Sequence, residues 1–134
     1  MRLIGHSLGG SVAIVVASKR PEVISTLVVA EANLDPGLGP FSARILAAGE
    51  EGYVRADFRS ALEQLREVAK DDWLSAITLG MQQLASPRAM YRTARSLVAE
   101  RSPTYRELLV QLEMRRSFLV GSETLRTARE ASFG

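Results

Sequence analysis

Apolar runs and turn residues divide the first thirty residues into a strand, a helix and a second strand. Residues 2–6 form a short strand-like run, and residues 8–20 are so continuously apolar that they predict a helix buried on all sides. Pro21 ends that helix, and the β-branched run at 24–30 is typical of an interior parallel strand. A strand, a helix and a parallel strand make one right-handed βαβ unit, so this part of the chain predicts an α/β fold.

Helical periodicity replaces this pattern after a loop at 33–40 that is rich in glycine and proline. Apolar positions recur at helical spacing through 54–68, and again every four residues from Trp73 to Met81. Large apolar side chains at such positions are most often core residues. We therefore expect four side chains of this region in a core, with the lining of a binding pocket as the alternative: Trp73, Met81, Met90 and Tyr91.

Two more helices are predicted by their first residues. Ser86-Pro87 and Ser102-Pro103 each combine an N-cap residue with proline at the first helical position. A strand pattern then returns at 117–121. We expect a core made of segments 1–40 and 115–134, with a helical insertion at 41–114.

Composition excludes several kinds of site. The chain has 134 residues, of which 46% are hydrophobic and 24% charged, which suits a domain with its own core. It has no cysteine and a single histidine, so thiolate and multi-histidine metal sites are excluded. We expect neither a metal nor any other cofactor.

The charges point to no polyanionic partner. The net charge is only +2, and the cluster of Arg88, Arg92 and Arg95 has no aromatic stacking platform beside it, so we interpret it as a solvated helix face. No apolar run reaches the roughly 18 residues of a membrane span. Nor does Met1 precede a basic and then apolar leader. We expect a cytoplasmic chain that binds neither nucleic acid nor membrane.

The one motif that carries chemistry is Gly5-His6-Ser7-Leu8-Gly9, which fits G-x-S-x-G between a predicted strand and a predicted helix. At such a turn the serine is strained and exposed, and side chains two positions before and after it would collide. Gly5 and Gly9 would remove that bulk. The helix that follows would point its first amides and its positive dipole end at the Ser7 hydroxyl.

With this motif, the strand after the helix, the helical insertion and the further strand, the chain resembles the α/β-hydrolase family. The resemblance implies a partial α/β-hydrolase fold in which parallel strands surround a nucleophile elbow and 41–114 forms a cap. It also implies that Ser7 attacks the acyl carbon of a small-molecule ester, lactone or similar substrate, and that the Leu8 N–H gives half of an oxyanion hole.

The acid of a catalytic triad has two candidates. In most of the family it follows the strand after the cap, where Glu123 is the nearest carboxylate, although Thr124 occupies the usual position. A subset similar to the haloalkane dehalogenases takes the acid from the end of the strand after the elbow helix. Glu31 lies there, with Asp35 further along the loop. We favour Glu31, and a solvated carboxylate at a strand end is the alternative.

No residue of the sequence suits the role of base. His6 is the only histidine, and neighbouring residues of a strand point to opposite sides, so we expect His6 to pack against adjacent strands rather than reach Ser7. In the family the base histidine follows the last strand, and the second oxyanion donor precedes the elbow. We therefore expect a central fragment of a hydrolase with little or no activity of its own.

A strand at 2–6 without upstream neighbours would leave Leu3 and Ile4 beside an open sheet edge, and such an edge is a template for pairing with another chain. We accordingly expect self-association through this edge. The alternative function, from a different class, is a non-catalytic module that binds a partner chain through the helical insertion and the sheet edge.

Overall fold

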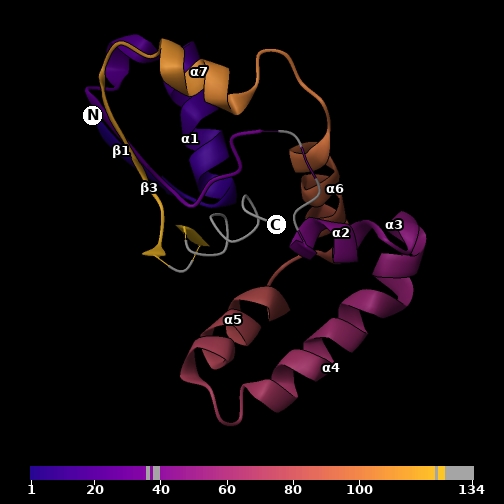
Figure 1. The fold of residues 1–134 in the computed structure, drawn as a ribbon. Helices are drawn as coiled ribbons and strands as arrows, with labels where there is room; N and C mark the ends of the chain where they lie inside the picture. The colour runs from indigo at the N-terminus through magenta and orange to yellow at the C-terminus, as the bar shows by residue number, and fades with distance from the viewer. Residues whose placement is uncertain (36, 38–39, 123, 126–134) are drawn as a thin grey trace. The chain divides into compact units, whose positions relative to one another are not determined.

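A computed structural model describes residues 1–35, 37, 40–122 and 124–125 (Figure 1). The chain divides into two compact units, one made of residues 1–36 and 100–134 and the other of residues 37–99.

The first unit is built on a parallel sheet of three strands, β1 (Arg2–His6), β2 (Thr26–Ala30) and β3 (Arg115–Leu119), in the order β1-β2-β3. As predicted, β2 is the interior strand, and its Leu27 and Val29 are fully buried. The strand expected at 117–121 begins two residues earlier, at Arg115. The chain thus has the α/β fold that its sequence predicts.

Helix α1 (Leu8–Lys19) lies over β1 and β2 and buries one face rather than all of them. Ile14 and Ala17 are completely buried in the core of this unit, whereas Val12 and Val16 are 53% and 40% exposed. The expectation of a helix buried on all sides was wrong, because the described elements cover only the face of α1 that meets the sheet and one neighbouring helix. Helix α1 ends at Lys19, and a short 3-10 turn follows it at Pro21–Val23.

That neighbouring helix is α7 (Tyr105–Gln111), which packs against α1 within the first unit although it falls in the expected insertion. It begins two residues later than Ser102-Pro103 predicted. The Thr104 hydroxyl accepts from the Glu107 N–H at 3.1 Å, and the Glu107 carboxylate accepts from the Thr104 N–H at 2.7 Å. This capping box satisfies two free amides at once, so Thr104 and not Ser102 caps the helix.

The second unit is helical. A π-helical turn at Tyr53–Asp57 joins the helix that ends at Gly52 to the helix that begins at Phe58. The helices are α2 (Pro40–Leu46), α3 (Gly49–Gly52), α4 (Phe58–Val68), α5 (Trp73–Gln83) and α6 (Pro87–Val98).

Packing in this unit joins α2 to α6 and α4 to α5, and its buried cluster consists of Ile45, Tyr53 and Ala94. Helix α6 starts as predicted, with Ser86 as N-cap accepting from the Ala89 N–H at 3.4 Å. Of the described helices, none is long and apolar enough to cross a membrane.

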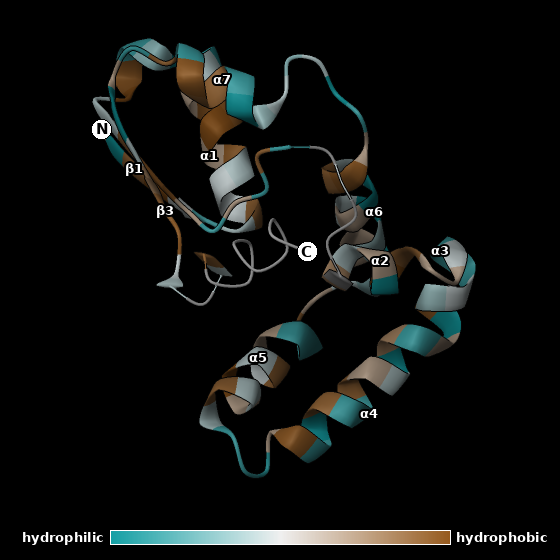
Figure 2. Cartoon of the chain, viewed as in Figure 1, coloured by the Kyte–Doolittle hydropathy of each residue, from teal (hydrophilic) through white to brown (hydrophobic). Residues whose placement is uncertain are grey.

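Two of the expected core residues lie on the surface. Trp73 is 75% exposed and Met81 69% exposed, both on α5, where Figure 2 shows apolar and polar residues interleaved. The expectation was wrong because α5 packs extensively against only one element of its unit, α4, which leaves much of its surface uncovered. Met90 and Tyr91, in contrast, pack against the buried cluster.

Candidate active site

Ser7 occupies the turn between β1 and α1 and has an unusual backbone conformation, with φ 51° and ψ −125°. Positive φ in a residue other than glycine is strained, and such strain persists where the surrounding structure enforces it. Here the Ser7 N–H donates to the Ala30 carbonyl at 2.8 Å, and the Ser7 carbonyl accepts from the Gly10 N–H at 2.9 Å. The side chain is exposed and makes no helix-capping hydrogen bond, so the hydroxyl stays available.

Close backbone packing explains two of the glycines of the turn. A Cβ on Gly5 would lie 2.4 Å from the Gly9 carbonyl oxygen, and a Cβ on Gly10 would lie 2.7 Å from the Ala32 Cβ. A Cβ on Gly9 would meet nothing within 4 Å. The expectation that Gly9 removes such bulk was therefore wrong: Gly10, one residue further on, makes the tight contact, because the first turn of the helix lies against Val29 of β2 and Ala32.

The first two amides of α1, those of Leu8 and Gly9, have no backbone partner among the described residues. Gly10 and Ser11, in contrast, donate back to the Ser7 carbonyl. The first N–H groups of a twelve-residue helix carry its positive dipole end. An oxyanion that develops on a carbonyl attacked by Ser7 would find these donors close to it.

Glu31 follows β2 at the same edge of the sheet, since His6, Ala30 and Leu119 are in register across the three strands. Its φ is also 51°, and its N–H donates to the Leu119 carbonyl at 3.0 Å. The carboxylate accepts a hydrogen bond from the Gly121 N–H, and a Cβ on Gly121 would come within 2.8 Å of Glu31 Oε1. The Glu31 carboxylate is thus hydrogen-bonded to backbone at the strand end while remaining partly exposed.

Asp35 is engaged elsewhere. Arg106 of α7 binds its carboxylate through both Nε and Nη2, with Nη2 2.6 Å from Oδ2, and this hydrogen bonding lowers the pKa of Asp35. The Arg106 N–H also donates to the Leu34 carbonyl at 2.9 Å. Asp35 therefore fastens the loop after β2 to α7. Glu123, the other candidate acid, lies outside the described residues.

His6 is exposed, although its backbone pairs with Ala30 in β2. The expectation that the His6 side chain packs against adjacent strands was wrong, because β1 is an edge strand of the described sheet and the side chain is exposed.

The arginine cluster of the helical unit is partly paired within that unit. Glu50 lies 3.7 Å from Arg88 and 3.1 Å from Arg92, so two members of the arginine cluster have a carboxylate of their own unit as partner. Within the described ranges, no group of three or more His, Asp or Glu side chains could hold a metal ion.

Comparison with known proteins gives a likeness in fold. No known family model matches the sequence, and no curated protein matches it. Among solved structures, a thioesterase domain from the curacin biosynthetic pathway aligns with 99% of this chain at 20% identity and a TM-score of 0.51. Identity at this level shows the fold alone. The chain therefore has a partial α/β fold like that of this neighbour, and it spans 57% of the neighbour's length.

Proposed function

We propose that the chain belongs to a hydrolase of acyl bonds in which Ser7 is the nucleophile. The observation that supports this most directly is the positive φ of an exposed serine between a parallel strand and a helix N-terminus. A substrate with an ester or thioester bond suits such a site, and the fold neighbour is itself a thioesterase domain.

In this proposal Ser7 Oγ attacks the acyl carbon while its proton passes to a base, and the carbonyl electrons move onto oxygen. The N–H of Leu8 stabilises that oxyanion. Collapse of the intermediate expels the alcohol or thiol, which takes the proton from the base and leaves the acyl group on Ser7. Water activated by the same base then releases the acid and restores the hydroxyl.

Glu31 is the proposed acid that orients the base and stabilises its cation. The Gly121 N–H holds its carboxylate beside the end of β3, at the sheet edge where β1 also ends. His6, the one histidine of the sequence, belongs to β1 itself, and we do not assign it the role of base. A serine without a base is a poor nucleophile, so we expect little turnover by the 134-residue chain alone.

Free imidazole tests this proposal, because it can replace a histidine side chain. We expect p-nitrophenyl butyrate to be hydrolysed faster by the unsubstituted chain than by Ser7→Ala when imidazole is present, and at nearly equal rates without it. Ser96→Ala, which removes an exposed serine of α6, is the matched control and should behave as the unsubstituted chain. Equal rates for Ser7→Ala and the unsubstituted chain at every imidazole concentration would reject Ser7 as the nucleophile.

A non-catalytic role in binding a partner chain is the second candidate. It is favoured by the apolar residues on the sheet face opposite α1, where Ile4 is 75% exposed and Leu119 53% exposed. Exposed apolar surface of this kind is typical of interaction sites. This role predicts association without dependence on Ser7.

A further inference from the structure

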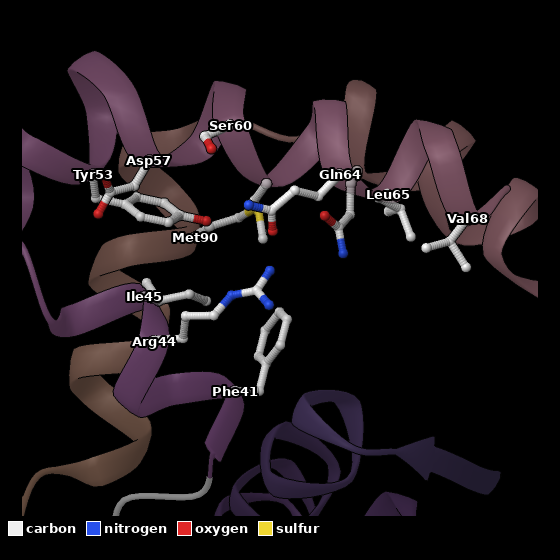
Figure 3. Close-up of a pocket in the computed structure, with 12 residues that line it drawn as sticks. Phe41, Arg44, Ile45, Tyr53, Asp57, Ser60, Gln64, Leu65, Val68 and Met90 are labelled. Carbon is white, nitrogen blue, oxygen red and sulfur yellow. The ribbon is translucent and has the colours of Figure 1, made fainter.

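The helical unit contains a cavity of about 500 Å³ within residues 37–99 (Figure 3). Its walls come from α2, the π-helical turn, α4, α5 and α6. Its size is within the range of small-molecule sites. Apolar side chains form much of the lining, namely Phe41, Ile45, Leu65, Val68 and Met90.

Tyr53 brings a buried polar group to this cavity. The residue is only 4% exposed, and its ring packs near Phe58 and Tyr91. Within the described residues its hydroxyl has no hydrogen-bond partner, yet it is not sealed from solvent, and Figure 3 shows it directed into the cavity. Burial raises the pKa of the phenol, and the Asp57 charge adds to this while the Arg44 charge opposes it. The hydroxyl therefore remains a neutral donor at physiological pH.

Arg44 brings a positive charge to the same space. Figure 3 shows its guanidinium pointing into the cavity between Phe41 and Gln64. Across the described ranges no carboxylate lies within 4.0 Å of it, in contrast to Arg88 and Arg92, which Glu50 pairs. Asp57 also lines the cavity, but it lies at the far end beside the Tyr53 ring. A planar guanidinium without a partner fits a carboxylate through two parallel hydrogen bonds.

We propose that this cavity binds a small monocarboxylate with an apolar chain, its carboxylate held by Arg44 and the Tyr53 hydroxyl. The apolar walls take the chain, with Leu65 and Val68 on α4 lying further along the cavity than the arginine. A phosphate dianion is a poorer fit, because one arginine balances one negative charge and Asp57 would repel the second. This site lies wholly in the helical unit and does not depend on the proposed role of Ser7.

Calorimetric titration of the full chain with octanoate tests the proposal, since binding is measured independently of catalysis. We expect saturable one-site binding in low salt that weakens as salt screens the exposed arginine. Arg44→Gln should lose roughly tenfold in affinity, and Tyr53→Phe roughly threefold to tenfold. Arg59→Gln, which removes an exposed arginine of α4 outside the cavity lining, is the matched control and should bind octanoate as the unsubstituted chain does.

Octanol has the same apolar chain as octanoate but no charge, so it tests whether the charge is needed. Octyl phosphate replaces the carboxylate by a phosphate, so it tests which anion the site prefers. Each should bind at least about tenfold more weakly than octanoate. No binding of octanoate, equal binding by Arg44→Gln and Arg59→Gln, or tighter binding of octyl phosphate would each overturn the proposal. Circular dichroism of each variant confirms that the helices are retained, and a Tyr53→Phe variant that unfolds leaves the exposed Arg44 comparison as the decisive one.

Discussion

Ser7 and Glu31 follow neighbouring parallel strands and share a φ of 51°, and they are the two residues other than glycine with positive φ in the described part of the chain. A hydrogen bond of 2.8 Å from the Ser7 N–H to the Ala30 carbonyl ties one turn to the residue before the other. Each such conformation costs about 1–3 kcal/mol, and strain of this kind clusters at functional sites. This pairing is the structural basis for placing a hydroxyl and a carboxylate in one proposed site.

The turn between β1 and α1 predicts different effects for alanine at Gly5 and at Gly9. Gly5→Ala would push a methyl group into the backbone of Gly9 and Gly10, so we expect a loss of about 1–3 kcal/mol in the free energy of unfolding. Gly9→Ala meets open space inside a helix and should be neutral or stabilising by up to about 1 kcal/mol. Urea denaturation of both variants measures the contrast, and equal effects would contradict the packing described for the turn.

The ion pair of Asp35 and Arg106 predicts a small dependence of stability on pH. Because hydrogen bonding to Arg106 lowers the pKa of Asp35 in the folded chain, its contribution is complete above the ordinary value of 3.8 and is lost as the pH falls through the lowered pKa. Both side chains are more than half exposed, so the pair contributes no more than about 1 kcal/mol. A double-mutant cycle of Asp35→Asn and Arg106→Gln by urea denaturation should show coupling at pH 7 that weakens progressively as the pH falls below 3.8, and coupling that does not change with pH would refute the assignment.

Comparison of Glu31→Gln with Asp35→Asn distinguishes which of the two carboxylates acts as the acid. The side-chain amide of Glu31→Gln can still accept from the Gly121 N–H but has no charge to stabilise an imidazolium. We expect the imidazole-dependent acylation of Ser7 to fall by at least about tenfold. Asp35→Asn should leave the rate unchanged, because the Asp35 carboxylate is bound by Arg106. A rate that falls in Asp35→Asn but not in Glu31→Gln would exchange the two roles.

The edge strand predicts self-association. Ile4 on β1 is 75% exposed, and β1 pairs on one side only within the described sheet. We expect sedimentation to find oligomers, and Ile4→Lys to reduce them because charge on an edge strand opposes pairing. Ile77→Lys, on the exposed face of α5 in the other unit, should leave association unchanged. A monodisperse monomer of the unsubstituted chain would contradict this prediction.

Local signals in the sequence predicted the first unit well. The apolar run ending at Ala30 required an interior strand, and the glycines around Ser7 required a tight turn between a strand and a helix. The start of α7 was mispredicted at Pro103, although Thr104 and Glu107 have the spacing of a capping box and a search for that pattern would have found it.

Contacts distant in sequence were not predictable in this way. Trp73 and Met81 have the spacing of core residues, but whether a stripe is buried depends on what packs over it. Arg44 and Tyr53 lie nine positions apart on separate elements, and only the packing of the helical unit brings them to one cavity. The hydrogen bond from Gly121 to Glu31 joins two strand ends in the same manner.

Mapping of the acylated residue determines whether Ser7 is the nucleophile. The chain is treated with p-nitrophenyl acetate in the presence and absence of imidazole, and tandem mass spectrometry then locates the acetyl group. We predict acetylation of Ser7 that requires imidazole, persists in Ser96→Ala and falls at least about tenfold in Glu31→Gln. Acetyl groups spread over lysines and other serines, with Ser7 no more reactive than Ser96, would contradict the account.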